Sequence, residues 1–181
     1  MICDRHFIHY TKYQHTLTNL IYFLHAYSFY CRGNVYRSRL AEAYLNSKEL
    51  PAFKSFSSGI AATNGNGIIS WYAQRIIEKE KLVSYESPFW QKTSEELLNS
   101  ADITVFMQEE YFDYCRTNLG FINKNYEFWD IKDLNEALLS KTGMLPINET
   151  EQILATEETF EKIKGKIDDL IKRFSKKNEL E

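Results

Sequence analysis

One segment, residues 26–47, restricts the possible folds of this chain more than any other. Residues 26–30 are an apolar run, residues 31–36 contain Gly33 and Asn34, and residues 37–47 place apolar side chains on one helical face. The segment therefore predicts a buried strand, a tight loop and a helix in direct succession. Strand-like and helical runs continue to alternate along the chain, which predicts an α/β fold with parallel strands and helices on both faces of the sheet.

Further strands are predicted at residues 53–58, 103–107 and 126–131, and further helices at 68–80, 94–99 and 109–118. Residues 65–67 are predicted to form a loop, and residues 141–155 an irregular stretch interrupted by Gly143 and Pro146. A last helix is predicted to begin at Thr156, because six apolar residues recur there at helical spacing and are expected to pack in the core: Phe160, Ile163, Ile167, Leu170, Ile171 and Phe174.

The composition is typical of one globular domain. The 181 residues are 44% hydrophobic and 26% charged, and the formal net charge of -3 argues against a broad nucleic-acid-binding face. We expect residues 1–24 to be an N-terminal extension and residues 25–181 to be the domain. The apolar stretch 20–30 is too short for a membrane-spanning helix, which needs about 20 apolar residues, so no membrane segment is predicted.

The three cysteines, Cys3, Cys31 and Cys115, are widely spaced and odd in number, which is not the pattern of a disulfide framework. This indicates a reducing, cytoplasmic location, where a reactive thiol stays free. The histidines within residues 1–24 have no cysteine or carboxylate at ligand spacing, so no metal and no other cofactor is predicted.

The loop between the first strand and the first helix has the residues of an anion-binding site. Backbone N–H groups and the helix dipole converge at such a position, and Gly33 allows successive N–H groups to turn inward. Cys31 begins the loop, where the same positive field would stabilise its thiolate as a nucleophile. Arg37 could hold two phosphate oxygens with its planar guanidinium, Asn34 could keep the loop in shape, and Ser38 could donate a hydrogen bond to the Cys31 sulfur.

These loop residues, followed by Ala41 and Glu42, resemble the signature Cys-x-Gly-Asn-x-x-Arg-Ser and the subsequent Ala-Glu of the low-molecular-weight protein tyrosine phosphatase family. Residues 57–59, 101–107 and 129–133 also resemble segments of that family. The resemblance implies a three-layer fold with a four-stranded parallel sheet and the anion-binding loop between strand 1 and helix 1.

The resemblance also implies a function. Cys31 would attack the phosphorus of phosphotyrosine or a related phosphomonoester and form a cysteinyl-phosphate intermediate, without a metal or cofactor. The substrate would be a phosphorylated protein or a small phosphomonoester, with Arg37 as the phosphate clamp. Six loop residues would bind it: Arg32, Gly33, Asn34, Val35, Tyr36 and Ser38.

An aspartic acid is implied as the general acid and base. Asp133 matches the aspartate of the family's Asp-Pro motif, and Asp130 is the competing candidate. Leu134 stands where the family has proline, and the tyrosine pair common after that motif is absent. Tyr36 replaces a second loop cysteine found in many members, and residues 85–93 lack the histidine that many members supply to the loop serine.

Two other functions are compatible with the loop. A non-catalytic phosphate- or phosphoprotein-binding module would have the same anion site, and Leu134 and the missing histidine favour it. An arsenate reductase shares the fold and the reactive cysteine, but a thioredoxin-coupled relay needs two further cysteines, and only Cys115 follows Cys31. The sequence gives no oligomeric state and no physiological substrate.

Overall fold

The computed structural model describes residues 25–51, 53–143 and 148–178. Four strands form one parallel sheet in the order β2-β1-β5-β6, which confirms the predicted fold class. They are β1 (His25–Cys31), β2 (Phe53–Gly59), β5 (Ile103–Phe106) and β6 (Tyr126–Phe128). Cys31 is in register with Gly59, and Tyr30 with Phe106, so the carboxyl ends of three strands meet at one edge of the sheet.

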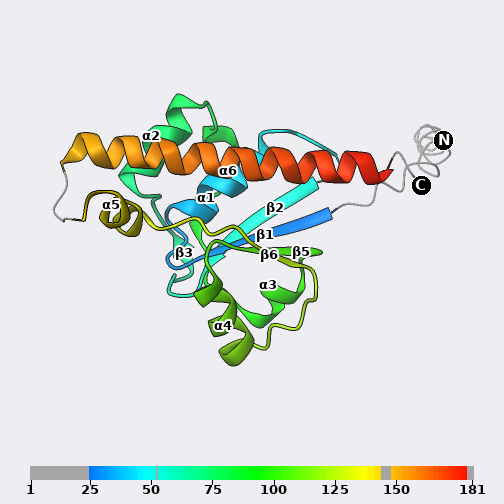
Figure 1. The fold of residues 1–181 in the computed structure, drawn as a ribbon. Coiled ribbons are helices and arrows are strands. Elements are labelled where there is room, and N and C mark those ends of the chain that lie inside the picture. Colours follow the sequence, from blue (N-terminus) through cyan, green and yellow to red (C-terminus); the bar gives the residue numbers. More distant parts are fainter. Residues whose placement is uncertain (1–24, 52, 144–147, 179–181) are drawn as a thin grey trace, which may run out of the picture.

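Helices cover both faces of this sheet (Figure 1). α1 (Arg37–Asn46) packs on β1 and β2, and α6 (Glu149–Asn178) runs across α1 as the outermost element on that side. α3 (Glu95–Asn99) and α4 (Glu109–Asn118) lie on the opposite face. Because β1 is enclosed from both faces and both edges, Tyr27, Phe29 and Tyr30 are fully buried.

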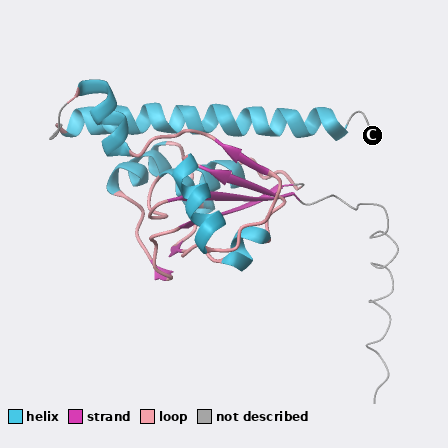
Figure 2. Cartoon of the chain, turned by 60° about the horizontal axis from the view of Figure 1, so that its bottom comes forward, coloured by secondary structure: helices cyan, strands magenta, loops and turns pink. Residues whose placement is uncertain are grey.

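α2 (Trp71–Lys79) and α5 (Leu134–Thr142) pack beside α6, which extends along one side of the molecule (Figure 2). A single 3-10 turn, η1 (Val83–Tyr85), follows α2. The predicted loop at residues 65–67 contains a short strand instead, because β3 (Gly65–Asn66) pairs antiparallel with β4 (Phe89–Trp90). Gly67 lies directly against Trp90, where a Cβ would be 1.9 Å from the indole Cδ2, so only glycine fits there.

The last helix confirms the predicted apolar stripe but not the predicted start. Phe160, Ile163, Ile167 and Leu170 are all buried. The helix begins at Glu149, seven residues before the predicted Thr156, because the Asn148 side chain accepts a hydrogen bond from the backbone N–H of Glu151 (3.0 Å) and so caps it. The predicted irregular stretch 141–155 was therefore wrong over residues 149–155, and its first residues end α5.

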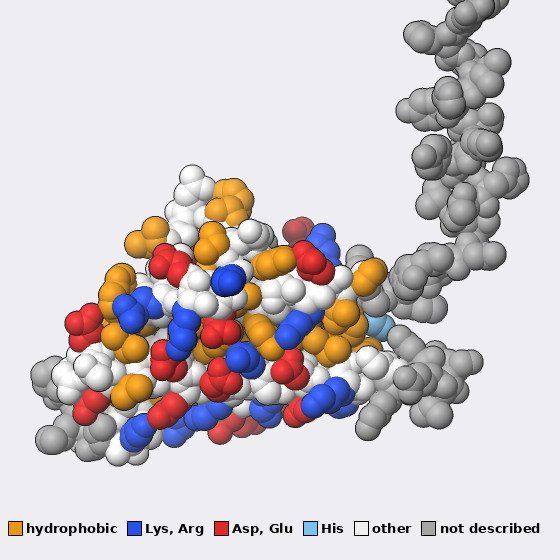
Figure 3. Space-filling view, turned by 90° about the horizontal axis from the view of Figure 1, so that it is seen from above, with side chains coloured by type: hydrophobic (Ala, Val, Ile, Leu, Met, Phe, Trp, Pro, Cys, Tyr) orange, Lys and Arg blue, Asp and Glu red, His pale blue; other side chains and the backbone are white. Residues whose placement is uncertain are grey.

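The outer face of α6 is charged rather than apolar. Lys and Arg side chains alternate with Asp and Glu side chains across it (Figure 3). Lys79 of α2 pairs with Glu157, and Lys141 of α5 pairs with Glu158, both at 2.7 Å. Solvent screens exposed pairs of this kind and they add little to stability, so the buried stripe is what holds α6 in place. None of the described helices is long and apolar enough to cross a membrane.

Candidate active site

The loop that joins β1 to α1 has its carbonyl groups turned toward neighbouring segments. The Cys31 carbonyl accepts from the N–H of Ile60 (3.2 Å), and the Arg32 carbonyl accepts from the N–H of Ala61 (2.8 Å). In a trans peptide the next N–H points the opposite way, so the N–H groups of Arg32 and Gly33 are directed to the other side. Successive N–H groups on one side of a loop are the kind of donors that bind an anion.

Asn34 is the structural centre of the loop. It has a left-handed backbone with φ of 55°, and its N–H donates to the Cys31 sulfur at 3.3 Å. Its side-chain nitrogen donates to Ser38 Oγ (3.2 Å) and to Ser57 Oγ (2.8 Å). Its side-chain oxygen accepts from the backbone N–H of Gln91 at 2.8 Å. Asn34 therefore uses its backbone N–H and both ends of its side-chain amide to fix the loop around Cys31.

The Ser38 hydroxyl lies 3.0 Å from the Cys31 sulfur. Because Asn34 already donates to Ser38 Oγ, the hydroxyl proton of Ser38 is free to point at the sulfur. Both side chains are buried, with Cys31 2% exposed and Ser38 fully covered. A thiolate at this position would receive two hydrogen bonds, from the Asn34 N–H and the Ser38 hydroxyl.

Glu42 closes this hydrogen-bond network from the next turn of α1. Ser57 donates to the Glu42 carboxylate at 2.5 Å. Burial raises the pKa of Glu42 to about 7, while the hydrogen bond from Ser57 and the charge of Arg39 oppose the shift. The network from Glu42 through Ser57 and Asn34 to Ser38 therefore contains a carboxyl group that titrates near neutrality.

Gly59, at the end of β2, lies directly against the backbone of the loop. A Cβ at this position would be 2.6 Å from the Asn34 nitrogen, 2.7 Å from the Arg32 oxygen and 2.8 Å from the Gly33 carbonyl carbon. All three are backbone atoms, so no flexible side chain could move aside. The glycine is thus required by close approach of the loop rather than by its own backbone angles.

The Arg37 side chain is fully buried, and its guanidinium donates hydrogen bonds to four acceptors in the segments that follow β5 and β6. One terminal nitrogen donates to Gln108 Oε1 (2.5 Å) and to the Ile131 carbonyl (2.8 Å). The other donates to the Tyr111 hydroxyl (3.0 Å) and to Asp133 Oδ2 (2.8 Å). Burial lowers the pKa of Arg37, but the negative charges that face it outweigh this and raise the value overall.

Sequence reasoning missed Gln108 and Tyr111. Both residues come shortly after β5, and the carboxyl end of β5 reaches the same sheet edge as Cys31, so this position in the sequence was the available signal. Burial raises the pKa of Tyr111 to about 12, with Arg37 acting in the opposite direction, so its hydroxyl stays protonated. It can therefore donate to one partner while it accepts from Arg37.

Asp133 is brought to this site and Asp130 is not. Asp133 is the N-cap of α5, where one carboxylate oxygen accepts from the Leu134 N–H (2.7 Å) while the other pairs with Arg37. Its side chain is 42% exposed and so remains accessible from solvent. Asp130 is exposed, has a left-handed backbone with φ of 50°, and lies beside a separate hollow between α5 and α6.

The remaining predicted loop residues differ in exposure. Arg32 is exposed and lines a shallow hollow with Ile60, Ala61, Glu110, Tyr111 and Tyr114. Gly33 and Val35 are partly buried, and the Val35 carbonyl accepts from the N–H of Ser70. Tyr36 is only 5% exposed, and its ring points into the core toward Thr156 and Thr159 of α6. Tyr36 therefore supports the loop from below.

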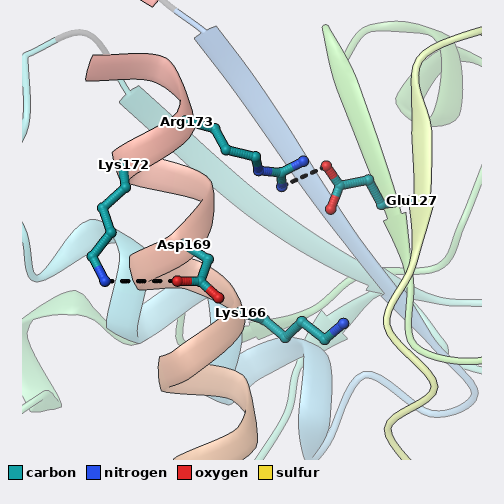
Figure 4. Close-up of a pocket in the computed structure, with 5 residues that line it drawn as sticks. All are labelled: Glu127, Lys166, Asp169, Lys172 and Arg173. Carbon is teal, nitrogen blue, oxygen red and sulfur yellow. Dashed lines mark hydrogen bonds and ion pairs between the residues drawn. The ribbon is translucent and has the colours of Figure 1, made fainter. Parts of the chain in front are cut away.

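Another hollow, separate from the two already described, lies between β6 and α6 (Figure 4). It is lined by Glu127, Lys166, Asp169, Lys172 and Arg173. Arg173 pairs with Glu127 at 2.7 Å and Lys172 with Asp169 at 3.7 Å. Phe174, the next residue, packs at a tilt against His25 at the start of β1, so this hollow is at the end of the sheet opposite to Cys31.

Cys115 is buried in α4, and burial raises its pKa to about 12, which suits a structural thiol and not a redox relay. Cys3 lies outside the described residues. No group of three or more His, Cys, Asp or Glu side chains that could hold a metal ion occurs in the described part of the chain.

A parallel α/β sheet whose first strand ends in a cysteine, with an anion-binding loop leading into a helix, defines a class of phosphate-handling proteins. Residues 27–180 match the family model described as low molecular weight phosphotyrosine protein phosphatase. The chain belongs to this family, as the sequence resemblance indicated, and it is a phosphatase. No match was found among curated proteins.

Several solved structures have the same fold as this chain. A low molecular weight protein tyrosine phosphatase from T. tengcongensis is 22% identical, with a TM-score of 0.64 over 82% of this chain and 99% of that one. The YwlE arginine phosphatase from Geobacillus stearothermophilus is 18% identical, with a TM-score of 0.60 over 82% and 94%. The tyrosine phosphatase Wzb from Escherichia coli K30, solved with sulphate, is 17% identical, with a TM-score of 0.60 over 81% and 99%.

Proposed function

We propose that this protein hydrolyses phosphotyrosine or a related phosphorylated group through a cysteinyl-phosphate intermediate, with Cys31 as nucleophile, Arg37 as phosphate clamp and Asp133 as general acid and base. One observation carries the proposal: the Cys31 sulfur accepts from the Asn34 N–H and contacts the Ser38 hydroxyl, at the start of the loop that joins β1 to α1. This arrangement stabilises a thiolate and, in front of it, a tetrahedral dianion.

In the first step the Cys31 thiolate attacks phosphorus in line with the leaving oxygen. The new sulfur–phosphorus bond forms as the phosphorus–oxygen bond breaks, and Asp133 gives its proton to the departing oxygen. The N–H groups of the loop, from Arg32 to Tyr36, hold the other three phosphate oxygens as charge develops on them.

Arg37 takes part in this step by exchanging its acceptors. In the free protein its guanidinium pairs with Asp133 at 2.8 Å. The oxygens of a bound phosphate dianion then compete with Asp133 for the Nη2 donor. Once Arg37 turns to the phosphate, the Asp133 carboxyl group is released from this contact and can face the leaving oxygen.

In the second step the Asp133 carboxylate removes a proton from water. The resulting hydroxide attacks the phosphocysteine, the sulfur–phosphorus bond breaks, and inorganic phosphate leaves. Ser38, 3.0 Å from the sulfur, stabilises the departing thiolate. Asn34 keeps the Ser38 proton directed at the sulfur because it donates to the same hydroxyl oxygen.

The substrate is a phosphorylated protein or a small phosphomonoester. Tyr111 and Tyr114 line one side of the hollow at the loop, and Ile60 and Ala61 line it as well, so its walls offer both ring and aliphatic surface. Arg32 adds a positive charge to this hollow and Glu110 a negative one, so its charges favour neither acidic nor basic sequences beside the phosphorylated residue. The nucleophile must be a free thiol, which places the protein in a reducing compartment such as the cytoplasm.

Steady-state hydrolysis of an aryl phosphate at about pH 5 to 7 tests the proposal. The wild type should turn over, Cys31→Ser should be inactive, and Asp133→Ala should lose about 10²- to 10³-fold in kcat. Peptides with phosphotyrosine and with phosphoarginine, assayed side by side, identify the preferred group. A wild-type protein that binds vanadate without turnover would instead indicate a binding module.

A further inference from the structure

Arg39 is a fully buried cation that lies outside the catalytic loop. It follows Ser38 in α1, and its side chain is 1% exposed. One terminal nitrogen donates to the Phe89 carbonyl at 3.0 Å, and the other to the Glu86 carboxylate at 3.0 Å and to the Ser87 carbonyl. All three acceptors lie on one short stretch, residues 86–89, between η1 and the end of β4.

The chain just after this stretch holds the loop. The Gln91 N–H donates to the Asn34 side-chain oxygen at 2.8 Å, and the Gln91 carbonyl accepts from the Gly59 N–H at 2.9 Å. The Thr93 N–H then donates to the Gly59 carbonyl at 3.1 Å. Residues 86–93 are thus anchored at one end by Arg39 and make contact at the other end with Asn34 and Gly59.

Asn34 has a left-handed backbone conformation, with φ of 55°, which asparagine adopts more readily than most other residues. In that conformation its N–H donates to the Cys31 sulfur. Residues 85–93 contain no histidine that could hold the loop. The two terminal nitrogens of the buried Arg39 cation donate to three acceptors, one of them the Glu86 carboxylate, whereas its Nε has no hydrogen-bond partner among the described residues.

We propose that Arg39 is a positioning residue that fixes residues 86–89 so that the Gln91 N–H holds Asn34 in the conformation required at Cys31. The inference rests on the proposed function of the loop. A guanidinium suits the task because its flat fork reaches two carbonyl groups and a carboxylate at once, whereas a lysine ammonium provides one point of contact. Arg39 itself touches neither the substrate nor Cys31.

The test compares Arg39→Lys, Gln91→Pro and the double variant in the full chain. Gln91→Pro removes the N–H that holds Asn34 and also fixes the backbone φ of residue 91, so its unfolding midpoint is compared with that of the wild type. Arg75→Lys is the matched control, because Arg75 is exposed on α2 and stacks on Trp71. The folded protein is alkylated with iodoacetamide at a series of pH values, and mass spectrometry of the peptide that contains Cys31 gives the extent of alkylation. The Kd for inorganic phosphate and the thermal unfolding midpoint are measured as well.

Arg39→Lys and Gln91→Pro should each raise the pH midpoint of Cys31 alkylation by about one unit and weaken phosphate binding about tenfold. The double variant should change neither quantity beyond the larger single effect, because both substitutions act through one hydrogen bond. Arg75→Lys should match the wild type.

Three results would overturn the inference: an unchanged midpoint in Arg39→Lys, a lowered unfolding temperature as its only effect, or fully additive effects in the double variant. A different result tests the proposed function. If the wild type itself binds no phosphate and Cys31 reacts like an ordinary thiol, with a midpoint near about pH 8.5, then the phosphatase site fails and not the role of Arg39.

Discussion

Replacing Gly59 with alanine should damage the loop more than it damages the fold. The new Cβ would lie 2.6 Å from the Asn34 nitrogen, where ordinary contact begins at 3.4 Å, so the loop backbone must move by about 0.8 Å. Overpacking of this kind destabilises a protein by about 1–3 kcal/mol. A misplacement near 1 Å in a catalytic site lowers the rate by about 10²-fold, so kcat/KM should fall by about 10- to 100-fold.

Urea unfolding and steady-state hydrolysis of an aryl phosphate measure these two effects. Gly165→Ala is the matched control, because Gly165 lies within α6 and a Cβ there meets nothing within 4 Å. Alanine in a helix interior should raise its stability by about 0.5–1 kcal/mol and leave kcat/KM unchanged. A Gly59→Ala protein with wild-type stability and wild-type kcat/KM would refute the contact between Gly59 and the loop.

Three further predictions concern single side chains. The folded-state pKa of Glu42 is raised from 4.5 to about 7, so the folded protein holds this proton more tightly than the unfolded chain does. The unfolding free energy should therefore fall by up to about 3 kcal/mol as the pH rises from 4.5 to about 7. Urea titrations at several pH values measure this slope, and Glu42→Gln should flatten it. Asp133→Asn should lower kcat by about 10²- to 10³-fold yet strengthen phosphate binding, measured calorimetrically, because Arg37 loses its anionic partner; weaker binding would contradict the proposed exchange. Phe160→Ala should lower the unfolding free energy by about 3–5 kcal/mol, since this buried ring packs edge-on against Tyr44, and an unfolding midpoint equal to that of the wild type would argue against the α6 stripe as core.

The sheet and the loop could be predicted because local sequence determines them. An apolar run followed by Gly33 and Asn34 specifies a strand and a tight loop, and both lie where the pattern put them. The predicted start of α6 was wrong by seven residues. Gly143 and Pro146 indicate an irregular stretch, whereas the helix start depends on the single capping residue Asn148. A helix cap requires a few polar residues, whereas an apolar stripe requires a whole face, so the stripe is the stronger signal.

Long-range contacts of buried cations could not be predicted. Arg37 meets Gln108 and Asp133, which are 71 and 96 residues away, and no local pattern encodes such pairs. Arg39 is a similar case, because a polar residue in an exposed turn of α1 would have the same appearance in the sequence. Sheet topology brings these residues together, so their partners emerge only once strand order and helix packing are known.

The most direct test of the central claim is a rapid-quench experiment with Asp133→Ala and an aryl phosphate whose leaving group needs little protonation. Without the Asp133 carboxylate to activate water, the second step should be slower than the first, and phosphoenzyme should accumulate. Peptide mass spectrometry should then find one phosphoryl group per protein, on Cys31. Turnover without any covalent phosphate, or phosphate on a residue other than Cys31, would contradict the mechanism.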